Sequence, residues 1–344
     1  MTPETVASVA ELEELLSRPT PDLEGALARL DGPLAVLGAG GKMGPSLARM
    51  ARRAGADVVA VSRFGDRAVR AALDAAGVRT LAADLLERAA LDALPDAAAV
   101  VFMAGRNFGI GAGPSATWAL NAGAAWNVAE RYAGVPTVVF SSGNVYPFVP
   151  ASGPGADEAT PPAPVGEYAR SVLARERVFE HASLARATPV LLLRLNYAVE
   201  LRYGVVLDVA KRVWEGRPVD LSTTHVNVIW QADANRVALR ALERCATPPE
   251  VLNVTGPERV SIRDLAERFG ELFARDVRFA RGGVRFARRA QPSALLADAR
   301  LARELFGAPR VDLERLAHWT AAWVLAGGET LGAPTHYEVR EGAF

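Results

Sequence analysis

The chain has 344 residues, half of them hydrophobic, and its 39 basic and 39 acidic side chains give a formal net charge of zero. This length supports one large domain, or two closely joined ones, around a sizeable core. The balanced charge argues against a nucleic-acid or membrane-surface partner, the single cysteine excludes an internal disulfide, and the four scattered histidines indicate no metal site.

Residues 1–30 precede the first strong strand pattern. Their leucines have helical spacing, and Pro19 and Pro21 interrupt the pattern in the middle, so we expect a helical N-terminal extension that packs on the main domain. The first 18 residues are acidic and lack the basic start and apolar run of a signal peptide. No apolar run approaches the ~20 residues that span a bilayer. We therefore expect a soluble, cytoplasmic protein.

A glycine-rich turn follows the apolar run at 34–37. Gly38, Gly41 and Gly44 have the spacing G-x-x-G-x-x-G, and a helical segment begins directly after them. Glycines allow a tight turn and let the backbone approach a pyrophosphate, whose charge then faces the N-terminus of the helix. We predict a dinucleotide site here, with Lys42 and Met43 of the same turn among its contacts.

From residue 34 to residue 195, apolar strands alternate with amphipathic helices. The expected strands are 34–37, 57–61, 78–81, 99–103, 137–141 and 189–195. Continuous apolar strands separated by helices indicate a parallel sheet that is covered on both faces. We predict an α/β fold, a Rossmann-like doubly wound parallel sheet, with residues 31–195 as the dinucleotide-binding domain.

The alternation is less regular after residue 196. We expect helices near 208–215, 233–245 and 261–273, and one strand at 251–254. This pattern predicts a smaller C-terminal region, residues 196–344, that mainly binds substrate. Residues 226–256 of this region are expected to return to the Rossmann sheet.

Several short motifs follow the glycine turn in a fixed order. They are Asp84-Leu85, Asn121, Ser141-Ser142-Gly143-Asn144-Val145-Tyr146, Tyr168, Arg194-Leu195-Asn196, Trp230 to Val237 and Leu252-Asn253-Val254-Thr255-Gly256. With this ordered set, roughly residues 33 to 325 resemble an extended short-chain dehydrogenase/reductase of the NAD(P)-dependent epimerase/dehydratase family. Any one motif is weak, whereas the set in order is specific.

The resemblance implies a role for each motif. Asp84 would hold the adenine, and Leu85 would add a backbone contact. Ser142 would hydrogen-bond the reacting oxygen, and Tyr168 would exchange a proton with it. Hydride transfer to a carbonyl needs such a proton donor beside the developing alkoxide, and a second hydrogen bond to orient it. The resemblance also assigns Ala104, Gly105 and Asn121 to the cofactor site and Asn144 to the substrate site.

The chain departs from the family at the residue four positions after the tyrosine. The family has a lysine there, which binds the nicotinamide ribose and lowers the pKa of the tyrosine, and this chain has Val172. Arg170 faces another side of the helix, and Arg175 lies about 10 Å further along the axis at ~1.5 Å per residue. We therefore expect no local cation in place of the lysine.

A second departure concerns the cofactor. NAD-selective members of the family end their second strand with an aspartate that hydrogen-bonds the ribose hydroxyls, whereas this chain has Ser62-Arg63. A neutral serine and a guanidinium suit a 2′-phosphate, so NADP is favoured and NAD stays possible.

A third departure concerns the substrate. Members that use nucleotide-diphosphate sugars carry an arginine just before the strand that leads to the equivalent of Asp233, and this chain has none at 225–228. The absence favours an unactivated sugar, sugar acid or polyol. The candidate substrate contacts are Asn144, Tyr197, Tyr203, His225 and Asn227.

These observations leave three hypotheses for the function. Ser142 and Tyr168 favour an NAD(P)-dependent oxidoreductase or epimerase of a small polyhydroxylated substrate. Val172 in place of the lysine favours a non-catalytic NAD(P)-binding sensor or regulator. The third hypothesis is a dehydratase or lyase that uses the same fold for proton transfer. A small-molecule substrate is the expected partner, and a homodimer is possible.

Overall fold

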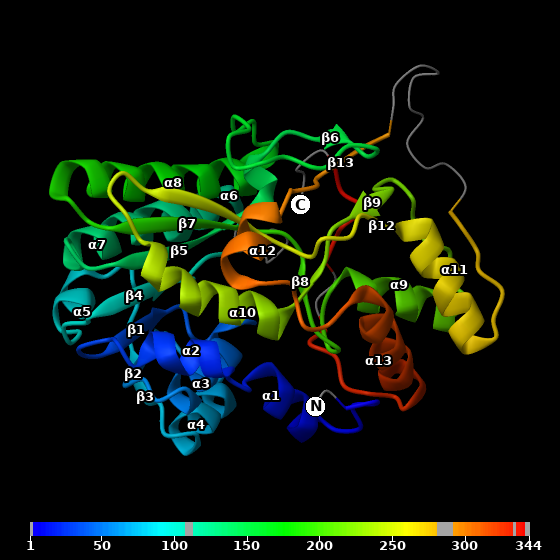
Figure 1. The fold of residues 1–344 in the computed structure, drawn as a ribbon, viewed down its shortest axis with the longest axis horizontal. Coiled ribbons are helices and arrows are strands. Elements are labelled where there is room, and N and C mark those ends of the chain that lie inside the picture. Colours follow the sequence, from blue (N-terminus) through cyan, green and yellow to red (C-terminus); the bar gives the residue numbers. More distant parts are fainter. Residues whose placement is uncertain (1–2, 107–112, 281–291, 333–334, 341–344) are drawn as a thin grey trace.

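The computed structural model describes residues 3–106, 113–280, 292–332 and 335–340. The N-terminal extension forms two helices, α1 (Val9–Leu16) and α2 (Pro21–Leu27), separated at the two prolines as the sequence predicts. The hydroxyl of Ser8 caps α1 by accepting a hydrogen bond from the amide of Glu11. Both helices pack on the main domain (Figure 1).

The centre of the fold is one sheet of seven parallel strands. Their spatial order is β11-β7-β5-β4-β1-β2-β3. The strands are β1 (Leu34–Leu37), β2 (Val58–Ser62), β3 (Arg79–Ala82), β4 (Ala99–Phe102), β5 (Thr137–Ser142), β7 (Val190–Leu195) and β11 (Glu250–Val254). The chain progresses outward in one direction through β2 and β3, and in the other through β4, β5, β7 and β11. The order therefore reverses beside β1, which is where open sheets of this type bind ligands.

Helices cover both faces of the sheet. One layer contains α3 (Gly44–Arg53), α4 (Arg67–Ala75) and α10 (Gln231–Arg240), and the other contains α5 (Arg88–Asp92), α6 (Gly113–Trp118), α7 (Ala124–Arg131) and α8 (Gly166–Arg186). In β1, Leu34 and Val36 belong to one apolar cluster, whereas Ala35 and Leu37 belong to the cluster on the opposite face. Every residue of β1 is buried and they alternate between the two faces, which confirms the predicted doubly wound sheet.

The C-terminal half adds a helical layer beside the open end of the sheet. Helices α9 (Val205–Trp214), α11 (Ile262–Phe273) and α13 (Leu313–Leu325) pack on one another, and α12 (Arg300–Phe306) lies against β11 (Figure 1). Among the described residues, three short strand pairs form outside the seven-stranded sheet: β8 (Ala198–Val199) with β10 (Ile229–Trp230), β9 (His225–Val226) with β12 (Val260–Ser261), and β6 (Val149–Pro150) with β13 (Ser293–Ala294).

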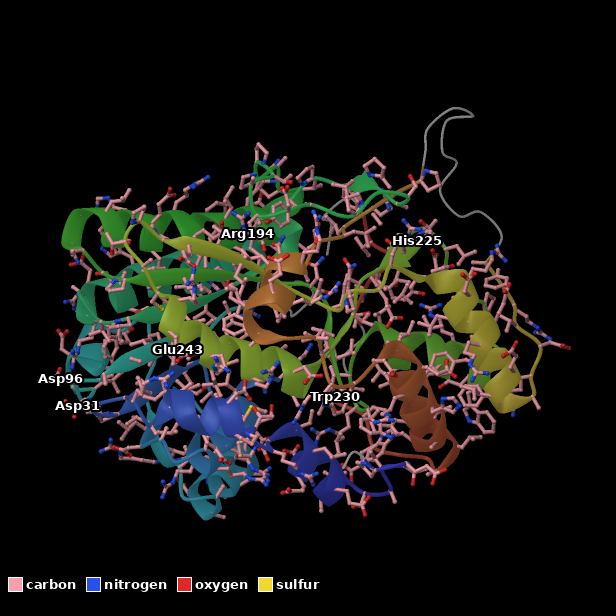
Figure 2. All side chains as sticks on the ribbon, in the orientation of Figure 1. Asp31, Asp96, Arg194, His225, Trp230 and Glu243 are labelled. Atoms are coloured by element: carbon pink, nitrogen blue, oxygen red, sulfur yellow. The ribbon has the colours of Figure 1, made fainter. Side chains whose placement is uncertain are left out.

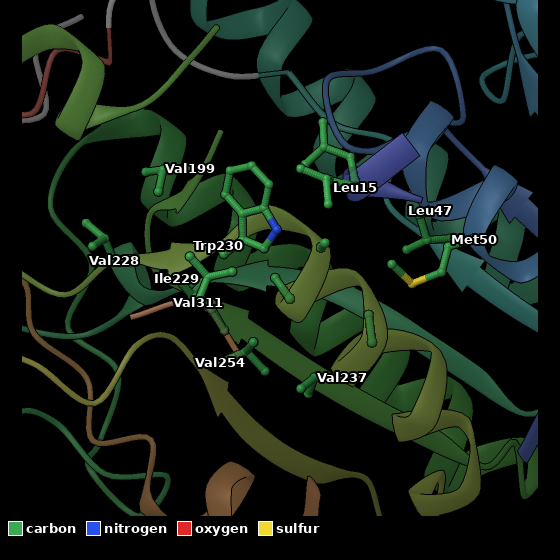
Figure 3. Close-up of a cluster of buried hydrophobic side chains, with 14 of the residues drawn as sticks. Leu15, Leu47, Met50, Val199, Val228, Ile229, Trp230, Val237, Val254 and Val311 are labelled. Carbon is green, nitrogen blue, oxygen red and sulfur yellow. The ribbon is translucent and has the colours of Figure 1, made fainter. Parts of the chain in front are cut away.

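One apolar cluster joins the two halves of the chain. Leu15, Leu47 and Met50 come from its N-terminal side, and Trp230 and Val254 come from the C-terminal half (Figure 3). Trp230 also meets the ring of Trp319 from α13 edge-on, with 5.5 Å between ring centroids. Because the cluster is shared, the C-terminal half is packed onto the Rossmann sheet.

Ion pairs attach the N-terminal extension to both halves. Glu13 of α1 pairs with Arg49 of α3 at 2.8 Å and with Arg202 at 2.7 Å. Asp22 of α2 pairs with Arg236 of α10 at 2.7 Å and with Arg240. Within the described ranges, no helix is both long enough and apolar enough to cross a membrane.

Candidate active site

The glycine turn after β1 has the shape that a bound pyrophosphate requires. Gly38 has φ +99°, and a Cβ there would lie 2.4 Å from the amide nitrogen of Ala104, so only glycine fits. A Cβ on Gly44 would lie 2.6 Å from the backbone of Ala39. A Cβ on Gly41 would meet only the carbonyl oxygen of Gly38, at 3.4 Å, and Gly41 lines a cavity. Two glycines thus hold the turn against the sheet, and the third keeps its open side clear.

A cavity of about 680 Å³ opens beside this turn, at the carboxyl ends of β1, β4, β5 and β7. The N-terminus of α3 also faces this end of the sheet, so its unpaired amides and positive dipole end favour an anion. The residues present therefore fit a dinucleotide. The predicted site residues that line the cavity are Gly38, Gly41, Lys42, Met43, Gly44, Arg63, Gly105, Asn121, Ser142, Asn144, Tyr168, Tyr197 and Tyr203.

Four other predicted cofactor residues do not line this cavity: Ser62, Asp84, Leu85 and Ala104. Ser62 ends β2, and its Oγ is 2.6 Å from the place that a Cβ on Gly40 would take. Arg63 follows it and lies 3.9 Å from the carboxylate of Asp84, and both side chains are partly exposed. Leu85 accepts a hydrogen bond from Asn127 through its carbonyl oxygen. Ala104, beside Gly38, is buried behind the turn.

Ser142 and Tyr168 meet at the middle of the cavity. Ser142 ends β5, and its hydroxyl accepts a hydrogen bond of 3.1 Å from the amide of Asn144. Tyr168 is in the first turn of α8, and its phenol lines the same cavity as Ser142. Burial raises the pKa of Tyr168, while the charge of Arg175 and the hydrogen bond to Ser142 act in the opposite direction. The sequence therefore brings together the two groups assigned to the reacting oxygen.

Asn121 lies in a π-helical turn, η1 (Ala119–Gly123), between α6 and α7, and it is fully buried. Its amide nitrogen donates 2.9 Å to the hydroxyl of Ser171 on α8. Its side-chain oxygen accepts hydrogen bonds of 2.9 Å from the amide of Arg106 and from the guanidinium of Arg175. Single π turns are frequent at functional sites, and this one connects the helix that carries Tyr168 to the end of β4.

Arg175 reaches the cavity, so the expectation that no local cation replaces the missing lysine is wrong. Arg175 lines the same cavity as Tyr168, and its positive charge acts to lower the pKa of the Tyr168 phenol. The axial distance between residues 168 and 175 is larger than the distance between the Tyr168 phenol and the Arg175 guanidinium. Side chains of an α-helix lean toward its N-terminus, and the arginine side chain is long. Val172, in the lysine's sequence position, is buried in the cavity wall.

A buried ion pair lies beneath the reacting groups. The guanidinium of Arg194 on β7 donates two hydrogen bonds, of 3.0 and 2.8 Å, to the carboxylate of Glu176 on α8. The side chains are 5% and 1% exposed, and the hydroxyl of Ser141 donates to the same carboxylate. Arg194 lies within the sheet half of the molecule (Figure 2). These contacts fix α8 against β5 and β7, and thereby fix Tyr168 relative to Ser142.

Lys42 and Tyr203 form the opposite wall. The ammonium of Lys42 lies 3.4 Å from the centre of the Tyr203 ring, a cation–π contact. Burial lowers the pKa of Lys42 to about 8, with the carboxylate of Asp208 acting against it. Burial also raises the pKa of Tyr203 well above its ordinary value. Tyr197, with φ +38°, completes this wall.

The two remaining predicted substrate contacts do not line the cavity. The amide of Asn227 donates to the carbonyl oxygen of Glu258 at 3.3 Å and accepts from the amide of Ala297 at 2.9 Å. His225 in β9 contacts the hydroxyl of Thr224 at 3.0 Å, and Figure 2 shows it near α11, far from Arg194. The side chain of Asn227 thus joins segments of the C-terminal half, whereas that of His225 contacts the preceding residue.

Several cavity residues were missed by the sequence analysis. Arg175 was set aside on axial distance alone. The segment after α13 has no helical or strand period, yet it lines the cavity with Thr335, His336 and Val339. Thr335 is held by two hydrogen bonds to the carboxylate of Asp208, of 2.9 and 2.5 Å. Arg106 and Leu295 also line the cavity and had no motif to mark them, and Gln231 lines it although the motif from Trp230 to Val237 gave it no role.

A doubly wound sheet with a glycine turn at its switch point, and a serine–tyrosine pair in the cavity beside it, defines a dinucleotide-dependent enzyme of the short-chain dehydrogenase/reductase type. The chain belongs to the NAD dependent epimerase/dehydratase family, whose model matches residues 34–254. The family resemblance predicted from the ordered motifs is confirmed. No curated protein sequence matches the chain significantly.

Several solved structures of such enzymes share the fold. WbmG of Bordetella bronchiseptica in complex with NAD is 22% identical with a TM-score of 0.71, covering 88% of this chain and 97% of that one. The UDP-glucuronic acid 4-epimerase of Bacillus cereus in complex with NAD is 19% identical, with a TM-score of 0.70, covering 85% and 98%. MoeE5 in complex with UDP-glucose and NAD is 23% identical, with a TM-score of 0.69, covering 86% and 99%.

Proposed function

We propose that the chain is an NAD(P)-dependent oxidoreductase or epimerase of a small polyhydroxylated substrate, with Ser142 and Tyr168 at the reacting oxygen. The observation that carries this proposal is that these two side chains line the same cavity beside the glycine turn, where Ser142 acts on the pKa of Tyr168. Membership of the NAD dependent epimerase/dehydratase family supports it.

In the proposed reaction, the nicotinamide supplies a site that accepts and returns a hydride. The phenolate of Tyr168 takes the proton of the substrate hydroxyl as that hydroxyl becomes a carbonyl, and the phenol returns it in the reverse direction. Ser142 donates a hydrogen bond to the same oxygen and limits its movement. The buried wall around them, including Val172, excludes water from the reacting atoms.

We propose NADP as the favoured cofactor. Support comes from the end of β2, where Ser62 and Arg63 stand instead of an acidic residue and Arg63 lines the cavity. The guanidinium of Arg63 is 66% exposed, which leaves it free to turn toward a 2′-phosphate. Asp84, 3.9 Å away, is then its partner in the cofactor-free enzyme and the proposed adenine contact in the complex.

We propose a sugar, sugar acid or polyol without a nucleotide as the substrate. The 225–228 segment carries no arginine, and its side chains at 225 and 227 do not line the cavity. Lys42, Tyr197 and Tyr203 would then contact the substrate or the adjoining phosphates. A nucleotide sugar is the second candidate, because MoeE5 was solved with UDP-glucose and another structure of the same fold is a UDP-glucuronic acid 4-epimerase.

The two other hypotheses from the sequence have less support. A non-catalytic sensor was favoured by the loss of the lysine, and Arg175 now offers a cation in the same cavity. A dehydratase or lyase would need a further acid or base beside the substrate. No carboxylate lines the cavity among the residues that the structure describes, so Tyr168 would have to supply that proton transfer.

We also propose a cytoplasmic homodimer formed through the outer face of α7 and α8. Trp126 of α7 is 47% exposed and stacks on His181 of α8 at 5.9 Å between ring centroids. Leu184, one turn further along α8, is 63% exposed. Large exposed apolar side chains on two neighbouring helices are typical of a protein–protein contact.

The proposed function is tested by binding and turnover with the same preparation. NAD and NADP are titrated by calorimetry, and then free sugars, sugar acids, polyols, UDP-glucose and UDP-glucuronate are screened for a change in nicotinamide absorbance and for epimerised product. We expect turnover of one free polyhydroxylated compound, and its loss in Tyr168→Phe. Turnover of the UDP sugars alone would establish the second candidate, and full activity of Tyr168→Phe would refute the assignment of the tyrosine.

A further inference from the structure

We propose that Arg175 is a positioning residue that takes over the electrostatic role of the missing lysine, holding a positive charge beside Tyr168 and favouring its phenolate. The inference rests on the proposed function, because it assigns Arg175 a task within that reaction. Arg175 is on the same helix as Tyr168, two turns later, and its guanidinium returns along the helix to the shared cavity.

The guanidinium is held in place by uncharged oxygen atoms. Nη1 donates 2.7 Å to the carbonyl oxygen of Phe140, Nε donates 3.2 Å to the carbonyl oxygen of Asn121, and Nη2 donates 2.9 Å to the side-chain oxygen of Asn121. The ring of Phe102 lies beneath it at 5.2 Å. Phe140 directly precedes Ser141 and Ser142 in β5, so the strand that carries Ser142 also holds the guanidinium of Arg175 in place.

Within the parts of the chain that the structure describes, no carboxylate oxygen lies within 4 Å of the Arg175 guanidinium, and the charge of Glu176 acts on it from a longer distance. Arg194 on the next strand, by contrast, donates two hydrogen bonds to the carboxylate of Glu176. Arg175 is only 5% exposed, so water screens its charge weakly. Burial lowers the pKa of Arg175 to about 10, which keeps it protonated at neutral pH.

The backbone at residue 105 leaves room for the guanidinium. A Cβ on Gly105 would lie 2.6 Å from Nη2 of Arg175 and 3.1 Å from the side-chain oxygen of Asn121. An alanine there would push the flexible end of Arg175 out of its place. Val172, at the lysine's position, presents an apolar wall that does not compete for the same acceptors.

Other polar and charged groups near Tyr168 also influence its pKa, so the effect of Arg175 has to be compared with theirs. Ser142 acts to lower the pKa of Tyr168, and the Tyr203 phenol interacts with that of Tyr168 electrostatically. Glu176 acts on the charge of Arg175 itself. Lys42, Arg63 and Arg106 line the same cavity. Arg175 is the charged side chain that lowers the pKa of Tyr168.

The test measures the ionisation of Tyr168 directly, in the full chain without substrate or cofactor. The six tyrosines are replaced by 3,5-difluorotyrosine, whose more acidic phenol titrates where the fold is stable, and each is followed by ¹⁹F NMR. Tyr168→Phe assigns the resonance. We expect Arg175→Met to raise the pKa of Tyr168 by about one unit or more, and Arg175→Lys, which keeps the charge, to raise it by less.

Arg170→Met is the matched control, because Arg170 is an exposed arginine of the same helix that pairs with Glu167. It should leave the pKa of Tyr168 unchanged. Gly105→Ala carries the test if Arg175→Met does not fold, because it displaces the guanidinium and should also raise that pKa. An unchanged pKa in both Arg175→Met and Gly105→Ala, or an equal shift in Arg170→Met, overturns the proposal.

The measurement separates this proposal from the proposed function. An unchanged Tyr168 pKa in the Arg175 variants, together with lost turnover in Tyr168→Phe, refutes only the role of Arg175. The expected pKa shift together with full turnover in Tyr168→Phe refutes the proposed function and leaves the electrostatic coupling standing. As a rescue, Val172→Lys in the Arg175→Met background should return the pKa of Tyr168 toward its value in the unmodified sequence.

Discussion

Replacing Glu176 with leucine removes one partner of the ion pair beneath the reacting groups. Arg194 would keep its charge at 5% exposure without a carboxylate, and Ser141 would lose its acceptor. Breaking a buried ion pair on one side costs about 3–5 kcal/mol of folding free energy, because the remaining charge stays desolvated. We therefore expect Glu176→Leu to lower the free energy of unfolding by about this amount.

The assay is urea unfolding followed by tryptophan fluorescence, with two companion variants. Glu180→Leu is the matched control, because Glu180 pairs with Arg177 on the exposed side of the same helix, where such a pair contributes about 0–1 kcal/mol. The double variant Glu176→Leu/Arg194→Met removes both charges and should recover most of the loss. A loss in Glu176→Leu no larger than in Glu180→Leu would refute the reasoning, as would a double variant no more stable than the single one.

Four further predictions concern binding, catalysis and assembly. Arg63→Ala should weaken NADP binding by about 1.5–3 kcal/mol and leave NAD almost unchanged in calorimetry, whereas equal losses would contradict the 2′-phosphate contact. Because burial raises the pKa of Tyr168, the rate of substrate oxidation should climb toward alkaline pH, while reduction, which uses the phenol, should proceed at neutral pH; a flat oxidation profile argues against Tyr168. Dinucleotide affinity should fall as the pH rises through about 8, where Lys42 loses its proton, and Lys42→Met should abolish this dependence. Trp126→Glu should halve the mass seen by sedimentation, and a monomeric starting protein would exclude the homodimer.

Local patterns were sufficient to predict the fold and the centre of the site. The sheet strands are short runs of buried residues such as 34–37 and 99–102, and their apolar continuity is visible without any tertiary information. Gly38 and Gly44 are required by backbone contacts that any chain with this turn must make. Ser142 and Tyr168 follow from their positions after a strand and at the start of a helix. Local order therefore determines these features.

The features that the sequence did not predict depend on side-chain direction and on distant packing. Arg175 was excluded because axial distance was counted and the N-terminal lean of helical side chains was not. His225 and Asn227 were assigned by alignment to a motif, whereas their hydrogen bonds go to neighbouring backbone and side-chain groups. His336 lies in an aperiodic segment, and only the contact of Thr335 with Asp208 on α9 brings that segment to the cavity. Non-local contacts of this kind leave no period in a single sequence.

The π turn between α6 and α7 makes the length of this stretch as important as its composition. A π turn closes its hydrogen bonds over five residues instead of four, so it accommodates one residue more than a regular α-helical turn. Asn121 lies inside this turn and points inward at Arg175, whereas Trp126 lies after it, on α7, and is exposed. A single-codon deletion between 119 and 123 would remove the residue that the turn accommodates and restore a regular helix. We expect such a deletion to disconnect the buried amide of Asn121 from Arg175 and α8, although every remaining residue stayed the same.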